Sequence, residues 1–234
     1  MTDRSAHNIL MSYPFYREGT QKLRDGLLKS VHILDSEEFN DGHLFRTGDL
    51  CESICLVGSG NIRVYVSGIS GRGVMLYNVG SGELCPINVR MALAGTTALA
   101  NATASIDLVA LWLHSWAVRD LSSRFPEFRD FVQQSVIERF EEIILRISDI
   151  TTRRVDQRLV EFLLHEFSLS TYARPTIEMT QEEIALTVGA AREVVSRKLQ
   201  EFERIEAVKL GRGRIWLADI ERLNALMAPK KRAS

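Results

Sequence analysis

Four side chains with hydrogen-bonding heads share one side of a predicted helix near the end of the chain. Arg192 and Ser196 are four residues apart, as are Glu193 and Arg197, so all four point to the same side of a helix. Arginine can donate two hydrogen bonds to O6 and N7 of guanine, and glutamate can accept one from N4 of cytosine. The pattern predicts a surface that reads base edges in DNA. The alternative is a solvated helix face with a Glu193–Arg197 ion pair.

An upstream helix is predicted to support that surface. Thr180 followed three residues later by Glu183 is a capping box, which marks the start of a helix. Gly189 then marks a tight turn, where a positive φ is often required. The apolar positions that would pack the two helices together are Ile184, Val188, Ala190, Val195 and Leu199. Two short helices with this spacing are typical of a helix-turn-helix.

A β-hairpin is predicted to follow, because two short β runs flank GRG at 211–213, a sequence that suits a tight turn. Beside a helix-turn-helix, such a hairpin would be a basic wing. Residues 151–234 carry 15 Lys and Arg against 12 Asp and Glu, whereas residues 1–150 carry 14 against 18. The excess of cations in the C-terminal third favours an anionic partner for that part.

The composition bounds the class of protein. A length of 234 residues allows one large or two small domains, and a hydrophobic content of 45% is ordinary for a globular chain. No apolar run approaches the roughly 18 residues of a membrane span, and the N-terminal residues lack the apolar core of a secretory signal. We therefore expect a cytoplasmic protein that does not bind a membrane. Three cysteines, an odd number, do not indicate a disulfide framework.

The first half of the chain has the pattern of an all-β domain. Residues 1–35 are predicted to form short helices, and short β-rich runs separated by glycine turns then occupy residues 43–113. Regular short strands with such turns predict a β-barrel or sandwich. Within it, residues 61–79 are predicted to form a long hairpin.

A long helix is predicted from Ser123 to about Thr151. Its apolar stripe steps by three or four residues, at Phe128, Val132, Val136, Phe140, Ile143, Ile147 and Ile150. Such a stripe either crosses a large core or pairs with a copy of the same helix. We favour self-pairing, because the other face is rich in Glu, Arg and Gln. The polar residues 151–155 would then be a hinge.

The chain as a whole resembles the CRP/FNR family of bacterial transcription regulators. The most specific match is in the segment described first, where Glu193-Val-Val-Ser196-Arg197 fits an E-x-x-S-R pattern and Arg192 completes an R-E-x-x-x-R pattern. The resemblance implies an α+β fold with three parts. They are a β-roll like the jelly roll of cyclic-nucleotide-binding domains with N-terminal helices (1–122), a dimerisation helix (123–151) and a C-terminal winged helix-turn-helix (152–234).

The resemblance also implies a homodimer that regulates transcription, with RNA polymerase as a partner, on a palindromic double-stranded DNA site with TGA- or TGT-like half-sites. The family's DNA contacts would fall on Thr180, Gln181, Arg192, Glu193, Ser196, Arg197, Lys198, Arg212 and Arg214. Two positions depart from the family. Ala191 stands where many members carry Ser or Thr, and Lys198 stands where an apolar residue is common, so Lys198 would reach a phosphate.

The signal that controls DNA affinity would act at the β-roll. Cyclic-nucleotide regulators hold their ligand with a Gly-Glu pair and a later Arg-Ser pair. Gly82-Glu83 is present here, but no Arg-Ser follows, and Arg90 lies too early in the sequence to replace it. A buried phosphate would lack its compensating cation, so cAMP is disfavoured.

Cysteines offer another signal. Cys51 and Cys85 stand in Gly-Asp-x-Cys and Gly-Glu-x-Cys segments, which resemble a family branch with cysteines in the β-roll, and Cys55 is additional. In an extended strand Cys51 and Cys55 would be about 13 Å apart, too far for a disulfide. A redox or persulfide switch through Cys85 is the sharper hypothesis; the alternative is that the three thiols are small buried hydrophobes.

Other cofactors and functions remain as alternatives. The N-terminal cysteines of iron–sulfur members are missing, and an iron–sulfur or metal site would need a fourth ligand such as His43. Haem is a further option, although no motif singles out any of His7, His32, His43, His114 and His165. A cupin-like metalloenzyme would need a His-x-His cluster that the barrel strands lack. A regulator without a signal is the last alternative, and we expect no enzymatic activity.

Overall fold

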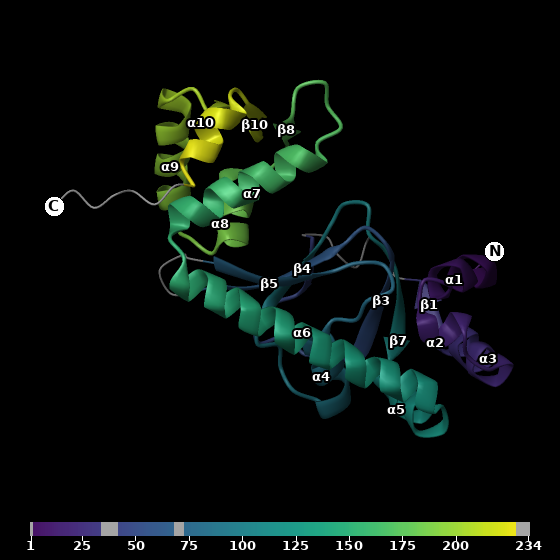
Figure 1. Ribbon diagram of the computed structural model, residues 1–234. Helices are drawn as coiled ribbons and strands as arrows, with labels where there is room; N and C mark the ends of the chain where they lie inside the picture. The colour runs from purple at the N-terminus through teal and green to yellow at the C-terminus, as the bar shows by residue number, and fades with distance from the viewer. Residues whose placement is uncertain (1, 34–41, 68–72, 228–234) are drawn as a thin grey trace. The chain divides into compact units, whose positions relative to one another are not determined.

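A computed structural model describes residues 2–33, 42–67 and 73–227 (Figure 1). The chain divides into two compact units, Met1–Val66 with Leu76–Leu145 and Ser67–Met75 with Arg146–Ser234. Among the described residues, no helix is both long enough and apolar enough to cross a membrane.

The first unit begins with three short helices that cover one sheet. They are α1 (Thr2–Leu10), α2 (Pro14–Arg17) and α3 (Gln21–Ser30). The hydroxyl of Thr20 accepts a hydrogen bond from the backbone N–H of Leu23 and so caps α3. Leu23 and Leu27 are fully buried against the sheet core. The helices predicted for residues 1–35 are therefore confirmed.

The strands of the first unit form two sheets, with orders β1-β7-β3 and β2-β6-β4-β5. The strands are β1 (Val31–Ile33), β2 (His43–Phe45), β3 (Ser53–Ser59), β4 (Ile62–Ser67), β5 (Gly73–Val79), β6 (Asn101–Ala104) and β7 (Val109–His114). This arrangement confirms the predicted β-rich domain, and β4 and β5 are neighbours, as the predicted hairpin requires. The turn of that hairpin lies outside the described residues.

Strand β3 is buried on both of its faces. Ile54 and Leu56 pack in the core beneath the N-terminal helices, whereas Cys55 and Val57 pack in a second core with residues of the other sheet. Successive side chains of a strand point to opposite faces. A strand with two buried faces therefore has a continuous apolar run rather than an alternating one.

Two helices of the first unit were not predicted, α4 (Pro86–Ala94) and α5 (Ser115–Arg124). Pro86 begins α4, and Gly95 ends it in the left-handed region at φ 63°. The second helix, α5, stops where Phe125 is extended, and Pro126 then starts a new helix. The predicted start of the long helix at Ser123 was therefore early, because Ser123 belongs to α5.

The long helix α6 (Pro126–Thr152) does not present its predicted stripe to one side. Phe128 and Val132 are buried in the core of the first unit, and Ile143 packs against the second core of that unit. Phe140 and Ile147 are instead 64% and 56% exposed. A spacing of mixed threes and fours drifts around a helix over seven turns, so the stripe divides between two faces.

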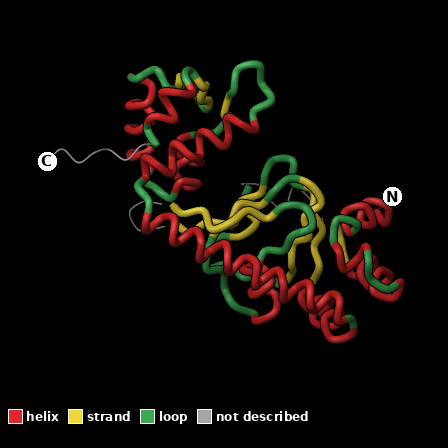
Figure 2. The backbone as a smooth tube through the Cα atoms, viewed as in Figure 1, coloured by secondary structure: helices red, strands yellow, loops and turns green. Residues whose placement is uncertain are grey.

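The second unit continues with helices and a small sheet (Figure 2). Its elements are α7 (Val155–Leu169), β8 (Thr176–Ile177), α8 (Gln181–Val188), α9 (Arg192–Arg204), β9 (Val208–Gly211), β10 (Arg214–Leu217) and α10 (Ile220–Ala225). The sheet order is β8-β10-β9. Only Arg153 and Arg154 interrupt the helical backbone between α6 and α7, so the break within the predicted hinge segment 151–155 is two residues long.

Candidate nucleic-acid interface

Helix α8 starts at the predicted capping box. The backbone N–H of Glu183 donates to the hydroxyl of Thr180 at 3.2 Å, and the backbone N–H of Thr180 donates to the carboxylate of Glu183 at 2.8 Å. These bonds satisfy N–H groups that the first turn of a helix leaves without partners. The Thr180 side chain, predicted as a DNA contact, therefore holds the start of α8.

The turn between α8 and α9 depends on Gly189. This residue is left-handed, with φ 63° and ψ 47°, which glycine adopts without the steric cost of a Cβ. The backbone N–H of Ala190 donates to the carbonyl oxygen of Ala185 at 2.9 Å and closes the turn. Ala185 and Val195 are buried where the two helices meet. Small Ala185 permits this close packing.

Helix α9 has one buried and one exposed side. Its buried residues are Val195, Leu199 and Phe202. The exposed side forms a hollow of about 490 Å³, whose lining residues are Gln181, Arg192, Glu193, Ser196, Arg197 and Gln200. Five of these six were predicted DNA contacts. Gln200 was missed, although it lies seven residues after Glu193 and so falls on the same side of the helix.

The charged heads of this hollow are not paired with one another. Among the described residues, no ion pair joins Glu193 to Arg197 or engages Arg192. Ala191 precedes the helix and provides no side-chain cap, as its departure from the family pattern predicted. The Glu193–Arg197 ion pair that was part of the solvated-face alternative is therefore not formed, and the three charged heads are exposed.

The remaining predicted contacts lie elsewhere in the second unit. Lys198 is half-buried and pairs with Glu201 at 2.7 Å. Arg214, on β10, pairs with Glu178 at 2.8 Å. Arg212 lies in the exposed turn between β9 and β10. None of these three residues lines the hollow on α9.

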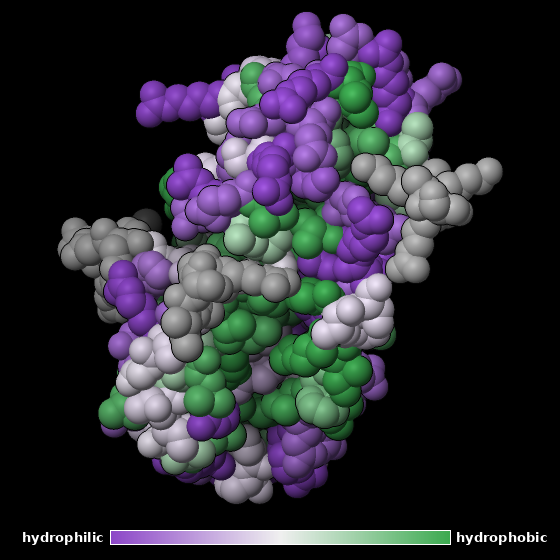
Figure 3. All heavy atoms as spheres, turned by 90° about the vertical axis from the view of Figure 1, so that its left-hand side faces the viewer, coloured by the Kyte–Doolittle hydropathy of each residue, from purple (hydrophilic) through white to green (hydrophobic). Residues whose placement is uncertain are grey.

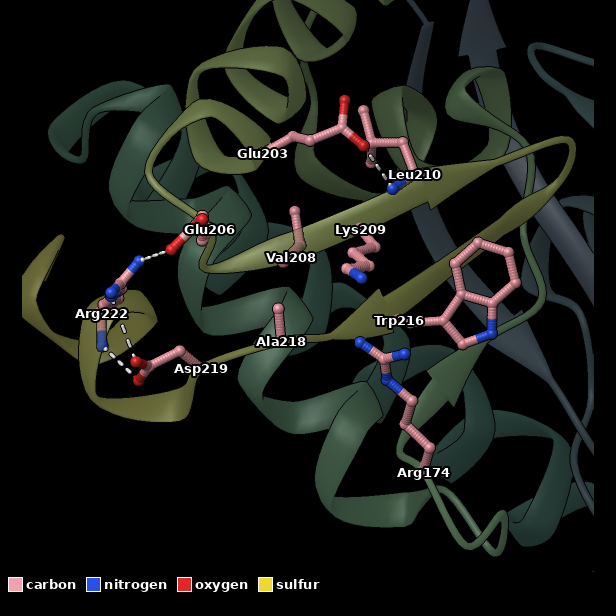
Figure 4. A pocket seen from close by; sticks show the side chains of 10 residues that line it. All are labelled: Arg174, Glu203, Glu206, Val208, Lys209, Leu210, Trp216, Ala218, Asp219 and Arg222. Atoms are coloured by element: carbon pink, nitrogen blue, oxygen red, sulfur yellow. Dashed lines mark hydrogen bonds and ion pairs between the residues drawn. The ribbon is translucent and has the colours of Figure 1, made fainter.

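A second hollow, of about 590 Å³, lies behind the wing and shows how the wing is held (Figure 4). The carboxylate of Glu203 on α9 accepts a hydrogen bond from the backbone N–H of Leu210 at 2.9 Å. Arg222 bonds the carbonyl oxygen of Ile205 at 2.9 Å and pairs with Glu206 and Asp219. These contacts tie β9 and α10 to the end of α9. The polar groups here are used in positioning the wing.

Comparisons with known proteins agree on one family. Residues 157–226 match the Crp-like helix-turn-helix domain. The chain is 26% identical to the cyclic AMP receptor protein of Thermus thermophilus over 172 residues, 74% of this chain and 78% of the relative. It is 27% identical to a CRP-like cAMP-activated global transcriptional regulator of Mycobacterium tuberculosis over 201 residues, 81% of this chain and 87% of the relative.

Solved structures share the fold over nearly the whole chain. A transcriptional regulator of the CRP/FNR family from Eubacterium rectale superposes with a TM-score of 0.72 at 22% identity, covering 92% of this chain and 98% of that one. A CRP/FNR-family regulator from Thermus thermophilus gives 0.64 at 22% identity, covering 84% and 97%. The chain is therefore similar to CRP/FNR-family regulators over most of its length, and residues 157–226 form a Crp-like helix-turn-helix domain. These findings support a DNA-binding transcription regulator of the CRP/FNR type and give no support to a cupin-like metalloenzyme.

The three cysteines of the chain share one core. Cys55 and Cys85 are fully buried, and Cys51 is half-buried beside them. The side chain of Asn88 connects this region: its oxygen accepts from the backbone N–H of Cys55 at 2.7 Å, and its amide donates to the carbonyl oxygen of Ser53 at 2.8 Å. Among the described residues, no group of three or more His, Cys, Asp or Glu could hold a metal ion.

Burial keeps these thiols protonated. Desolvation raises the pKa of all three thiols, because burial disfavours the charged thiolate. For Cys55, electrostatic interactions with the other two cysteines raise the pKa further. Tyr77 lies 3.6 Å from the sulfur of Cys85. Since the thiolate is the nucleophile, burial lowers the reactivity of all three thiols, and Cys51 is the most accessible of them.

Glu83, of the predicted Gly-Glu pair, is already engaged by an arginine of α6. Arg139 is buried and pairs with Glu83 at 2.5 Å and with Glu142 at 2.6 Å. Its guanidinium also lies 5.5 Å from the centre of the Tyr77 ring, within range of a cation–π contact. Arg90 is exposed and donates to the carbonyl oxygen of Thr97 at 3.1 Å. One oxygen of the Glu83 carboxylate is therefore paired with Arg139 in this conformation.

Proposed function

We propose that this regulator acts as a homodimer on palindromic DNA and that the hollow on α9 reads the bases. The observation that carries the proposal is the set of unpaired polar heads in that hollow, with Arg192, Glu193 and Arg197 exposed on one side of α9. The surface of the second unit in Figure 3 is mostly hydrophilic, as a DNA-binding face requires. Residues 1–122, 123–151 and 152–234 are the proposed sensor, dimerisation and DNA-binding parts.

The residue types suggest what each contact does. Arg192 and Arg197 can each bind guanine bidentately, and Glu193 can accept from cytosine N4. Ser196, Gln181 and Gln200 can hydrogen-bond to either a base or a phosphate. Half-sites with a TGA- or TGT-like core, as the family resemblance implied, contain one G·C pair and suit this mixture. Thr180, Lys198, Arg212 and Arg214 are proposed as contacts to the DNA backbone, since none of them lines the hollow.

Self-pairing of α6 is the proposed basis of the dimer. Ile137, Phe140 and Ile144 are 52%, 64% and 50% exposed, and they step by three and four residues, as in a coiled-coil seam. Figure 3 shows apolar side chains gathered on the first unit. Large exposed apolar patches on a soluble protein mark interaction sites. Two α9 helices related by a two-fold axis would enter successive major grooves about 34 Å apart, and RNA polymerase is the proposed partner on that DNA.

A DNA-binding titration tests the reading face. Fluorescence anisotropy with a labelled TGA-containing palindrome would compare the wild type with Arg192→Ala and with Arg204→Ala. Arg204 is the matched control, because it is exposed on the same helix but does not line the hollow. Loss of a bidentate arginine costs about 1–3 kcal/mol, so Arg192→Ala should weaken specific binding about 5- to 150-fold. Equal effects of the two variants would contradict the proposal.

A sedimentation experiment tests the proposed dimer. Sedimentation would compare Phe140→Glu, which places a charge in the proposed seam, with Glu141→Gln, its exposed neighbour on α6. Dissociation by Phe140→Glu alone would support self-pairing, and a wild type that remains monomeric at all concentrations would contradict it.

For the signal, we propose a thiol switch that begins at Cys51. Support comes from the shared core of the three cysteines and from the greater exposure of Cys51. A peroxide would oxidise the Cys51 thiol to a sulfenic acid and release water. A second thiol of the core would then condense with it to form a disulfide, with release of another water. Because Cys55 and Cys85 are buried, closing this bond would rearrange the core.

The same anisotropy assay separates this signal from its rivals. Reduced and peroxide-treated protein would be compared at fixed salt, with Cys51→Ser and Cys85→Ser as variants. A tenfold change in affinity, about 1.4 kcal/mol, that both variants abolish would support the switch. If DNA affinity is unchanged by oxidation but changes with cAMP or haem, the signal is a small molecule and not a thiol switch. If none of these treatments changes DNA affinity, binding is constitutive. We expect no response to cAMP, because no Arg-Ser pair follows Gly82-Glu83 to hold the cyclic phosphate.

A further inference from the structure

One charged side chain of the second unit is buried outside the hollow on α9. Arg158, in the first turn of α7, is only 5% exposed. Its guanidinium donates to the carbonyl oxygens of Ile150 at 3.1 Å and Arg153 at 2.5 Å, at the end of α6. It also donates to the carbonyl oxygen of Val188 at 2.9 Å, at the end of α8. Arg158 therefore bonds the C-terminal ends of two different helices at once.

This arrangement matches the chemistry of helix ends. The last carbonyls of a helix have no partner within it, and the C-terminal end carries a partial negative charge. A guanidinium presents five N–H donors in a fixed plane, so one arginine can serve both ends. A lysine has a compact point charge on a flexible stem and cannot hold two ends in one geometry.

A second contact joins the same two places independently. Gly189 begins the turn into α9, and a Cβ added there would lie 2.8 Å from Cδ1 and 3.0 Å from Cγ1 of Ile150. The side chain of Ile150 thus rests directly against the backbone of the turn. The guanidinium of Arg158 also donates a hydrogen bond to the carbonyl oxygen of Gly189 at 3.4 Å. The end of α6 is packed and hydrogen-bonded to the turn that precedes the reading helix.

We infer that Arg158 is a positioning residue for DNA binding. It fixes the turn between α8 and α9 to the end of α6, and so sets the position of the reading helix relative to the last turn of α6. A movement of the end of α6 would then reach α9 through Arg158 and through the contact of Ile150 with Gly189, as well as along the backbone. The inference rests on the proposed DNA-binding role of α9, and Arg158 itself does not line the hollow.

Two variants test the inference. Arg158→Lys keeps the charge, and Arg158→Met keeps the bulk without charge. Arg154→Lys is the matched control, because Arg154 is an exposed arginine only four residues away. Each protein would be titrated with the palindrome and with random-sequence DNA at several salt concentrations. All titrations would use the cysteine oxidation state in which the wild-type protein binds the palindrome most tightly. Thermal melting would first confirm that each variant is folded at the assay temperature.

The expected result is a tenfold or larger loss of affinity for the palindrome in both Arg158 variants, with less than a threefold change for random DNA and an unchanged salt dependence. A lost phosphate contact would instead lower the slope of the salt dependence by about one. Wild-type affinity in Arg158→Lys, or a changed salt slope, would overturn the inference. So would variants that lose thermal stability but keep their affinity where folded.

Hydrogen exchange separates this inference from the proposed function. If Arg158 anchors the turn, the amides of residues 189–194 should exchange at least tenfold faster in both variants without any DNA present. Should the wild type fail to distinguish the palindrome from random DNA, the proposed function fails, whereas faster exchange would still support the anchor. Unchanged exchange in these amides would overturn the anchor whatever the DNA titration shows.

Discussion

Alanine in place of Gly189 would add a methyl group where the end of α6 meets the turn. The backbone at Gly189 has φ 63°, and a left-handed conformation costs an L-residue about 1–2 kcal/mol. Lower entropy of the unfolded chain returns about 0.4–1 kcal/mol. The new Cβ would also lie 2.8 Å from Cδ1 and 3.0 Å from Cγ1 of Ile150. The end of that side chain can swing away, but its branched Cβ makes rotation at χ1 costly.

Crowding of this kind costs about 1–3 kcal/mol, so Gly189→Ala should destabilise the second unit by about 2–3 kcal/mol in total. Gly95→Ala is the matched control, since Gly95 has φ 63° as well but no atom within 4 Å of an added Cβ. It should show the backbone cost alone, about 1 kcal/mol. Denaturant unfolding, followed by hydrogen exchange in each unit, would measure both. An equal loss in the two variants would refute the claimed contact.

A double-mutant cycle isolates the steric part. In an Ile150→Ala background the space beside the turn is open, so Gly189→Ala should cost only its backbone share there. The coupling between the two changes should therefore be at least about 1 kcal/mol. If the free-energy losses of the two substitutions add strictly, the destabilisation by Gly189→Ala comes from the backbone and not from the contact with Ile150.

The remaining predictions concern the cap, the core and the thiols. Thr180→Ala should lower the stability of the second unit by about 1 kcal/mol, since it removes the cap of α8, while Thr187→Ala serves as a control away from the cap in a melting experiment. Leu199→Ala should cost about 2–5 kcal/mol and abolish DNA binding where the unit unfolds; retained stability would contradict the buried position of Leu199. Burial raises the pKa of the Cys55 and Cys85 thiols above the value in the unfolded chain. The stability that these protonated thiols contribute is therefore complete below about pH 8.5, and it is lost as the pH rises towards the pKa of the folded state. Chemical unfolding of the first unit at pH 7 and pH 10 should therefore show a loss that is smaller in Cys55→Ala, and an equal loss in both proteins would argue against buried thiols.

Local patterns in the sequence predicted the second unit well. The capping box of Thr180 and Glu183, the glycine turn and the exposed side of α9 each depend on residues within about four positions of one another, so their spacing alone defines them. Gln200 could have been found by extending the same spacing one more turn. The helix-turn-helix is therefore the part of the candidate site that can be predicted from the sequence alone.

Contacts between distant segments set the limits of that reading. Arg214 was predicted to reach DNA, but its carboxylate partner Glu178 lies in a segment 36 positions earlier, which spacing cannot reveal. The stripe of α6 was assigned to one interface, yet the first unit covers Phe128 and Val132, and only tertiary packing decides which turns are covered. The helix α4 was missed because its apolar residues surround it and give no helical period.

The glutamate between two arginines in the hollow has a consequence for the search along a genome. A carboxylate repels phosphates, so Glu193 weakens every encounter in which the hollow faces only the DNA backbone, and it is compensated where a cytosine offers its amino group. A genome presents roughly a million or more competing sequences, and time spent on each of them delays arrival at the target. If the hollow reads bases as proposed, its two cations and one anion would shorten the residence of the protein on random DNA and speed its release.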